Sequence, residues 1–209
     1  MIMTKIKFCG LTRKKDIEAV NILKPEYIGF VFAKSSKRFI DPVKAFELKK
    51  ILSPEILSVG VFVDENIKII SKIANNNIID LIQLHGNESE KYIYELRKLI
   101  NQDKKIIKAF TINNKNKNNI LNSAESSADY ILIDSGAGTG KLFDWEILNL
   151  NNISRKYFLA GGLNPENVGH AVKLLNPYAV DVSSGIELDG LKNYESMYKF
   201  IAAVRGEKI

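Results

Sequence analysis

Cysteine and histidine are scarce in this chain of 209 residues, which has one cysteine, Cys9, and two histidines, His85 and His170. A single cysteine excludes an intramolecular disulfide framework and indicates a reducing compartment such as the cytoplasm. The two histidines stand alone, so the spacing of a zinc site is absent. We therefore expect no metal site in this protein.

Long apolar runs are also lacking. No segment approaches the roughly 20 apolar residues that a membrane-spanning helix needs. The first residues, Met-Ile-Met-Thr-Lys, do not follow the charged, apolar and small-residue pattern of a signal peptide. We expect a cytoplasmic protein that does not associate with membranes.

Charge of one sign is present in only modest excess, because 30 lysines and arginines face 24 acidic residues and give a formal net charge of +6. Such a balance suits a nucleic acid, an anionic surface or a small anionic substrate, and the distribution of charge has to decide between them. The lysines are scattered along the expected helices among acidic residues rather than clustered. This pattern indicates a solvated surface and no nucleic-acid partner.

Short β-branched or aromatic runs bounded by turn residues recur along the chain. Eight of them read as strands: 6–9, 27–32, 57–63, 80–84, 105–110, 130–134, 157–160 and 179–182. Segments with helical periodicity lie between them, at 16–23, 42–52, 66–74, 88–99, 165–175 and 194–204. The Asn-rich stretch 113–122 is too polar for a confident helix and reads as a loop or a poorly formed helix.

Continuous apolar strands that alternate with helices are typical of a parallel sheet covered on its outer face. Eight such units without a large insertion predict an α/β fold, a (β/α)8 barrel in which residues 1–209 form one domain. The alternative is an open, doubly wound sheet.

In a (β/α)8 barrel the functional residues gather where the strands end. Here nearly every apolar run ends in a reactive or flexible group. These ends are Cys9-Gly10, residues 34–38, Asp64, His85-Gly86, residues 134–136, Gly161-Gly162 and residues 183–185. Any one of them could be an ordinary turn, but seven at the same rim indicate a site.

Two of these ends are glycine-rich and follow the seventh and eighth strands, where many barrels hold a phosphate with backbone N–H groups. Glycine at such positions lets the amides approach the phosphate oxygens. We predict a phosphorylated small-molecule substrate. Its predicted binding residues are Gly161, Gly162, Asp181, Ser183, Ser184 and Gly185.

Four further residues carry candidate chemistry. Cys9 and Asp134 end strands on opposite sides of the expected rim, and a thiol facing a carboxyl makes a base and acid pair. The alternatives are a buried apolar cysteine and an aspartate that caps a turn. The planar fork of Arg38 suits a substrate carboxylate, unless it is a surface charge. We expect His85 in the substrate-binding wall, as a hydrogen-bonded residue or as a catalyst.

Several segments, taken together and in this order, resemble the phosphoribosylanthranilate isomerase family. They are residues 7–13, 29–32 with 36–38, 83–86, 134–135 with 138–141, 143–145, 160–168 and 180–187. The resemblance spans nearly the whole chain. No single segment would suffice to identify the family.

The resemblance implies an isomerase of the aldose–ketose type in tryptophan biosynthesis. Its reaction is an Amadori rearrangement of N-(5-phosphoribosyl)anthranilate, without metal or cofactor. It implies that Asp134 is the general acid that opens the furanose ring, and that Cys9 is the general base at the second sugar carbon. A substrate with a carboxylate at one end and a phosphate at the other agrees with Arg38 and the two glycine-rich loops.

Other functions compete with this interpretation. An indole-glycerol-phosphate synthase would be expected to have an N-terminal extension and a lysine acid. A ribulose-phosphate epimerase would be expected to have paired aspartates with metal-binding histidines. A barrel that only binds a phosphorylated ligand belongs to a different class, against which the Cys9 and Asp134 pair argues. Apolar residues exposed on the helices are compatible with a homodimer.

Overall fold

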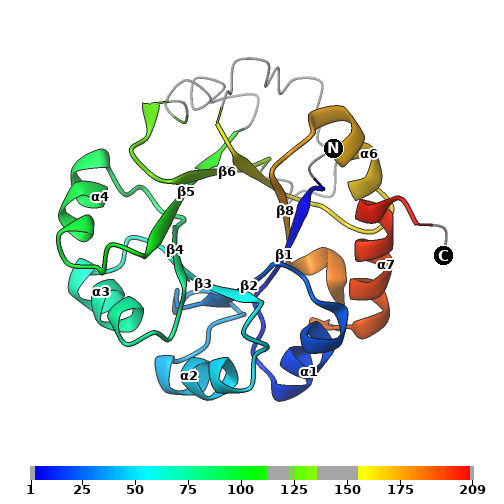
Figure 1. Cartoon of the computed structure of the whole chain (residues 1–209), viewed down its shortest axis with the longest axis horizontal. Coiled ribbons are helices and arrows are strands. Elements are labelled where there is room, and N and C mark those ends of the chain that lie inside the picture. Colours follow the sequence, from blue (N-terminus) through cyan, green and yellow to red (C-terminus); the bar gives the residue numbers. More distant parts are fainter. Residues whose placement is uncertain (1–2, 113–122, 124, 136–154, 208–209) are drawn as a thin grey trace.

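Eight parallel strands form a closed barrel in the computed structural model, which describes residues 3–112, 123, 125–135 and 155–207. Each strand pairs with its neighbour in sequence order, and β8 closes the ring against β1 (Figure 1). The strands are β1 (Lys5–Cys9), β2 (Tyr27–Val31), β3 (Leu57–Phe62), β4 (Leu81–Leu84), β5 (Lys105–Thr111), β6 (Tyr130–Asp134), β7 (Tyr157–Ala160) and β8 (Ala179–Val182). The predicted (β/α)8 barrel is confirmed, and the open sheet is excluded.

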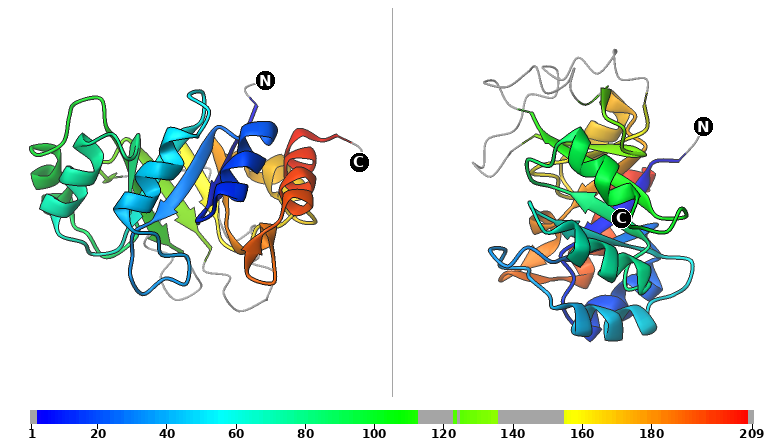
Figure 2. Two further views of the ribbon diagram at one scale, coloured as in Figure 1. Left: turned by 90° about the horizontal axis from the view of Figure 1, so that it is seen from below. Right: turned by 90° about the vertical axis from the view of Figure 1, so that its left-hand side faces the viewer.

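Helices cover the outside of the barrel. They are α1 (Lys14–Leu23), α2 (Pro42–Lys50), α3 (Ile67–Asn75), α4 (Glu90–Arg97), α6 (Val168–Leu175) and α7 (Tyr194–Arg205). After β8 come the 3-10 helix η3 (Ser184–Ile186) and a small hairpin of β9 (Glu187–Leu188) and β10 (Leu191–Lys192). Figure 2 shows the helices arranged around the strands. No helix in the described ranges is both long and apolar enough to cross a bilayer.

Two expected helices begin two or three residues later than their periodicity suggested, because side chains close to the start bind the backbone. Asn164 accepts hydrogen bonds from the backbone N–H groups of Glu166 and Asn167, so residues 165–167 form a turn and α6 begins at Val168. The Glu88 carboxylate accepts from the backbone of Gly86, and α4 begins only after Ser89 caps it. The segments 113–122, 136–141 and 143–145 singled out in the sequence lie outside the described residues.

The apolar residues form two main layers. Alternate strand residues face outward and pack against the helices; Ile6, Phe8, Ile28 and Phe30 are fully buried there. The strand residues between them point inward and fill the barrel interior with a second cluster, which includes Tyr27, Phe158 and Leu132. Burial on both faces explains why the strands read as continuous apolar runs.

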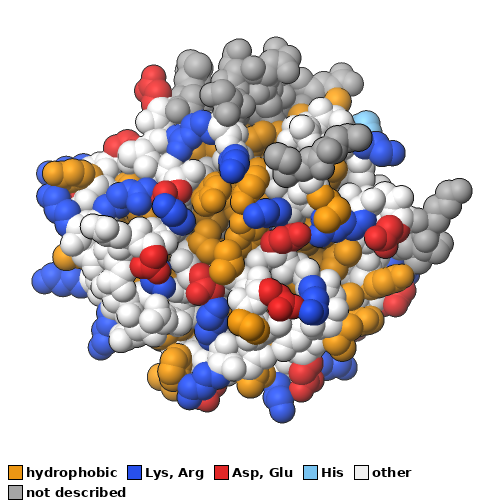
Figure 3. All heavy atoms as spheres, viewed as in Figure 1, with side chains coloured by type: hydrophobic (Ala, Val, Ile, Leu, Met, Phe, Trp, Pro, Cys, Tyr) orange, Lys and Arg blue, Asp and Glu red, His pale blue; other side chains and the backbone are white. Residues whose placement is uncertain are grey.

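The interior cluster closes the end of the barrel at which the strands begin. Tyr27, Tyr130, Tyr178 and Phe158 pack ring to ring there. Lys5 donates to the Tyr178 hydroxyl at 2.9 Å. In Figure 3 hydrophobic side chains gather at the centre of the face viewed, with lysine and arginine side chains beside them. This end is filled, and a pocket opens into the barrel at the opposite end of the strands.

Candidate active site

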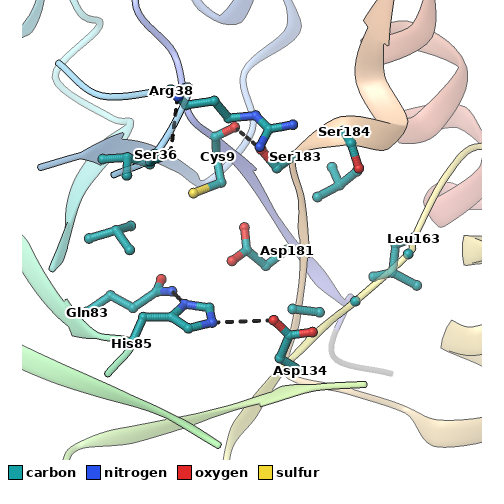
Figure 4. Close-up of a pocket in the computed structure, with 16 residues that line it drawn as sticks. Cys9, Ser36, Arg38, Gln83, His85, Asp134, Leu163, Asp181, Ser183 and Ser184 are labelled. Carbon is teal, nitrogen blue, oxygen red and sulfur yellow. Dashed lines mark hydrogen bonds and ion pairs between the residues drawn. The ribbon is translucent and has the colours of Figure 1, made fainter. Parts of the chain in front are cut away.

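A pocket of about 380 Å³ lies at the carboxyl ends of the strands. It brings together nine of the ten residues that the sequence singled out: Cys9, Arg38, His85, Asp134, Gly161, Gly162, Asp181, Ser183 and Ser184. The tenth, Gly185, follows directly in η3. Residues from six strands or the loops that follow them thus meet in one cavity (Figure 4).

Cys9 is the last residue of β1 and is 8% exposed. Its Sγ lies against Gly29 of the neighbouring strand, where a Cβ atom would be 2.6 Å from the sulfur. Burial raises the pKa of the Cys9 thiol, and the cation of Lys7 opposes this shift without cancelling it. The positive charge that a catalytic thiolate calls for is therefore present, two residues before Cys9 on the same inner face of β1.

Lys7 itself is fully buried and donates to Asp181 Oδ2 of β8 at 2.8 Å. The Asp181 carboxylate and the Cys9 thiol together keep the pKa of Lys7 raised, although burial alone would lower it. Lys7 was not singled out in the sequence for a role. Its signal is the alternation Lys5-x-Lys7-x-Cys9, which places all three side chains on one face of a strand.

Asp134 ends β6 across the pocket from Cys9, as Figure 4 shows. Its Oδ2 lies 3.3 Å from His85 Nε2, and His85 Nδ1 in turn accepts from Gln83 Nε2 at 2.8 Å. With the Gln83 amide in this orientation, the proton of a neutral His85 ring lies on Nε2, the nitrogen that faces Asp134. His85 is thus a hydrogen-bonded wall between Gln83 and the proposed acid.

Gly161 makes room for Asp134. It has a φ of +95°, and a Cβ there would lie 2.7 Å from Asp134 Oδ1 and 2.3 Å from Ser135 Oγ. The hydroxyl of Ser135 donates to the Gly161 carbonyl at 3.0 Å, and its backbone N–H donates to the Ala160 carbonyl at 3.1 Å. The end of β6 is therefore fastened to the loop after β7, and any side chain at position 161 would separate them.

Arg38 lies across the pocket from Asp134, as Figure 4 shows. Its Nε and Nη2 donate to the two carboxylate oxygens of Glu187 at 2.6 and 2.8 Å. This bidentate contact raises the pKa of Arg38 and fixes the plane of its guanidinium. The Nη1 edge has no acceptor among the described residues, so the fork is held in place with donors left for a ligand.

The loops after β7 and β8 line a further part of the pocket. Gly162, Leu163, Ser183 and Ser184 line it. Ser183 donates to the Cys9 carbonyl at 3.0 Å, and Lys192 Nζ donates to the Ser183 carbonyl at 2.8 Å. Within the described chain no acceptor is recorded for the backbone N–H groups of Ser184 and Gly185. Two first-turn amides at the start of η3 suit an anion.

The residues missed in the sequence are mostly those that hold the site residues in place. Glu187 accepts from both Arg38 and Lys192, and Gln83 orients His85. Hydrogen bonds from Arg38 and Lys192 lower the pKa of Glu187 to about 2, against the effect of burial. Gln83 lies inside a strand that reads as apolar, and its partner His85 follows two residues later on the same face of the chain.

A closed barrel of this kind, with a thiol, a carboxylic acid and an arginine around one pocket, defines a (β/α)8-barrel enzyme. The particular family follows from comparison with known proteins. The model of the N-(5'-phosphoribosyl)anthranilate (PRA) isomerase family matches residues 6–203, and the chain belongs to this family.

Similar proteins cover almost the whole chain. The N-(5'-phosphoribosyl)anthranilate isomerase of Thermoanaerobacter sp. (strain X514) is 43% identical over 98% of this chain and 99% of its own length. A crystal structure of phosphoribosyl anthranilate isomerase in complex with reduced 1-(o-carboxyphenylamino)-1-deoxyribulose 5-phosphate aligns with a TM-score of 0.84. It is 35% identical and covers 98% of this chain and 100% of its own.

A third comparison concerns assembly. A crystal structure of monomers generated from the dimeric Thermotoga maritima phosphoribosylanthranilate isomerase aligns with a TM-score of 0.82. It is 35% identical and covers 98% of this chain and 100% of its own. The structural similarity therefore extends over the entire barrel.

Proposed function

We propose that this enzyme catalyses the Amadori rearrangement of N-(5-phosphoribosyl)anthranilate to 1-(2-carboxyphenylamino)-1-deoxyribulose 5-phosphate in tryptophan biosynthesis. Family membership over residues 6–203 supports the reaction. The observation that carries the assignment of roles is the placement of Cys9 and Asp134 on opposite walls of one pocket. The reaction is an internal transfer of hydrogen, so it consumes no oxidant or reductant.

Asp134 is the proposed general acid. Its carboxyl donates a proton to the furanose ring oxygen as the bond from that oxygen to C1 breaks, and the nitrogen lone pair forms the C1–N double bond of a protonated Schiff base with anthranilate. Asp134 then carries the negative charge. The His85 Nε2–H that faces Oδ2 stabilises this carboxylate more than the neutral acid, so the contact favours the step itself. In this role His85 positions the acid.

Cys9 is the proposed general base. The thiolate removes the proton from C2, the electron pair forms the C1–C2 double bond, and the Schiff-base nitrogen regains its lone pair. The resulting enolamine becomes the ketone when C1 gains a proton and the C2 hydroxyl loses one. The burial that disfavours the thiolate makes it a stronger base once it forms, and Lys7 lowers the cost of forming it.

The carboxylate and the phosphate at the two ends of the substrate each have a complementary group in the pocket. The anthranilate carboxylate fits the guanidinium of Arg38, which Glu187 already orients. The phosphate fits the loops after β7 and β8, where Gly161, Gly162, Ser183 and Ser184 line the pocket and Gly185 follows in η3. Holding both ends places C1 and C2 between Asp134 and Cys9.

Organisation, cellular location and assembly complete the proposal. One barrel domain comprises the chain, since its eight strands run from Lys5 to Val182 and α7 packs beside α1. The cytoplasm is the expected location, because a catalytic Cys9 must stay reduced. A homodimer is expected from the dimeric relative and from exposed apolar residues such as Ile22 and Val43.

The direct test is the loss of fluorescence of freshly generated phosphoribosylanthranilate in the presence of the purified protein and a chelator. Turnover under these conditions supports the reaction. Binding of inorganic phosphate without turnover would instead support the competing function, a barrel that only binds phosphorylated ligands.

A further inference from the structure

A buried ion pair lies on the outer side of the barrel wall, beside the loop that follows β4. It joins Lys108 Nζ on β5 to Glu88 Oε2 at 2.8 Å, and the two side chains are 6% and 1% exposed. Lys108 stands between Ile107 and Ala109, whose side chains face the barrel interior, so its own side chain points outward. Neither member of the pair lines the pocket. Any effect on the reaction must therefore act through another residue.

The ion pair binds the backbone directly after His85. The Gly86 N–H donates to the two Glu88 oxygens at 3.1 and 2.9 Å, and Lys108 Nζ donates to the Gly86 carbonyl at 2.7 Å. The two peptide groups that follow His85 are thus each held by one member of the pair. Glycine has no side chain that would restrict its own backbone, so these contacts fix the turn from outside.

The same turn is fastened to the end of β3. The His85 N–H donates to the Phe62 carbonyl at 2.8 Å. The Asp64 N–H donates to Glu88 Oε1 at 2.9 Å, and the Asn87 N–H donates to Asp64 Oδ1 at 2.7 Å. The backbone is therefore bonded on both sides of the His85 Cα atom, and this determines the direction of the His85 side chain.

The contact that this backbone supports is sensitive to position. His85 Nε2 lies 3.3 Å from Asp134 Oδ2, at the long end of the range for an N–H···O hydrogen bond. A small outward displacement of the ring would remove the contact. In Figure 4 the ring lies between Gln83 and Asp134, with Nε2 toward the carboxylate. The distance to the proposed acid thus depends on how the turn after β4 is held.

We propose that Lys108 and Glu88 are positioning residues, which hold His85 at the distance from Asp134 that ring opening requires. This deepens the proposed function and rests on it for the reaction. Burying two charges costs much of what their attraction gains, and apolar residues of similar volume often stabilise a fold as well. The pair supplies the turn with a fixed donor and acceptors that apolar residues lack. Its effect on turnover therefore passes through His85.

The test is a double-mutant cycle on kcat and KM. Lys108→Met keeps the length of the side chain but removes the donor to the Gly86 carbonyl. We expect kcat to fall about fivefold to tenfold, with KM changed less than about threefold. In the His85→Ala background the same substitution should lower kcat less than about twofold, because the residue through which it acts is gone. Equal falls in both backgrounds would overturn the proposal.

Matched variants separate positioning from a loss of stability. Lys104→Met removes another buried lysine, which precedes β5, is 4% exposed and donates to the Ile79 carbonyl at 3.2 Å. It should lower stability in urea by a similar amount and leave kcat unchanged, whereas an equal loss of kcat would refute positioning. Glu88→Gln keeps an oxygen for the Gly86 N–H, so it should retain more of kcat than Glu88→Leu. Glu88→Gln also replaces Lys108→Met in the cycle if the latter does not fold.

A second measurement does not depend on activity. In protein with isotope-labelled histidine, NMR follows the ring nitrogens of His85, and His170 on α6 gives the reference signal. Asp134→Asn should shift the Nε2 resonance of His85 in the wild-type background and much less in the Lys108→Met background. Equal shifts in both backgrounds would overturn the proposal. A wild type that does not consume phosphoribosylanthranilate would remove the proposed function, and the NMR comparison would still decide the positioning.

Discussion

Cys9 combines two opposed effects within a few ångströms. Its burial raises the pKa of the thiol, while the ammonium of Lys7 lowers it. The Asp181 carboxylate neutralises much of that cation through a 2.8 Å ion pair and adds a further upward shift. The free enzyme therefore holds Cys9 mainly as the neutral thiol at pH 7, ready to form a strong base in small amount.

The reactivity of this thiol should report its pKa. Because Cys9 is the one cysteine in the chain, alkylation by iodoacetamide measures its thiolate alone. We expect the alkylation rate to rise with pH to a midpoint above the ordinary value of a free thiol, because burial raises the pKa of Cys9 more than Lys7 lowers it. A midpoint at or below about 8.5, the ordinary value, would contradict the described environment. Cys9→Ser, which should take up no label, is the control.

His85 should act on the chemical step rather than on binding. His85→Ala removes the N–H that faces Asp134, so we expect kcat to fall by roughly tenfold to a hundredfold while KM changes less than about threefold. His85→Gln places an amide N–H at a similar reach and should recover most of kcat. A large rise in KM with unchanged kcat would instead make His85 a substrate-binding residue.

At this scale the sequence indicates the ends of strands better than their interiors. Cys9, Asp134 and His85 end or follow apolar runs, and the carboxyl ends of all strands in a (β/α)8 barrel lie at one rim. Their position in the sequence was therefore enough to bring them together. Lys7 and Gln83 lie within strands. The partner of Lys7 is on β8, so its role depends on which strands become neighbours when the barrel closes, whereas Gln83 contacts His85 two residues further along the chain.

Among the elements, the hairpin of β9 and β10 connects Arg38 with the loop after β8. Glu187 in β9 accepts from Arg38 after β2 and from Lys192 in β10. Lys192 in turn donates to Ser183 in the loop after β8. Arg38 and the loop after β8 therefore share one network of charges. The hairpin has only two residues in each strand, which is too short for the alternation of the sequence to indicate.

This network should make stability depend on pH. Arg38 and Lys192 lower the pKa of Glu187 from near 4.5 to about 2, so the folded state binds this proton less readily than the unfolded state. The stabilisation is present above about pH 4.5 and is lost as the pH falls toward 2. We expect Glu187→Gln to reduce the free energy of unfolding by about 1–3 kcal/mol at pH 7, and by much less near pH 2.5.

Urea denaturation of the two proteins across this pH range measures the difference. A difference that stays constant from pH 7 to pH 2.5 would contradict the charge assignment. Glu195→Gln on α7 is the control, since that carboxylate is 62% exposed and its loss should cost less than about 0.5 kcal/mol.

For the whole molecule, closure of the ring depends on contacts between the two ends of the described chain. Arg205 at the end of α7 donates to the Thr4 carbonyl at 3.1 Å and to Glu26 Oε1 at 2.9 Å. The other oxygen of Glu26 accepts from the backbone of Ile6 in β1. The last helix is thereby joined to the first strand beside the β1–β8 seam.

Removing this contact should weaken the entire barrel. We expect Arg205→Gln to lower the free energy of unfolding by about 1–3 kcal/mol, because Glu26 and the Thr4 carbonyl lose a charged donor. Activity per folded molecule should not change, since Arg205 is remote from the pocket residues. Lys199→Gln on the same helix, whose partner is exposed, is the matched control. Equal effects of the two substitutions would contradict a role in closure.

The barrel as a whole was predictable because its repeat is simple. All eight strands occur within one residue of the expected bounds, since apolar runs between helical segments leave few other arrangements. The starts of α4 and α6 were wrong by two or three residues, because Glu88 and Asn164 bind the backbone locally. The spacing of apolar residues does not indicate such contacts between a side chain and the backbone.

The central claim is that Asp134 donates and Cys9 removes a proton on one substrate, and the most direct measurement compares their variants. Cys9→Ser and Asp134→Asn are assayed with the wild type by the loss of phosphoribosylanthranilate fluorescence, after circular dichroism establishes that all three are folded. We expect both variants to fall at least about a hundredfold in kcat. A folded variant of either residue that keeps wild-type turnover would contradict the assignment of that residue.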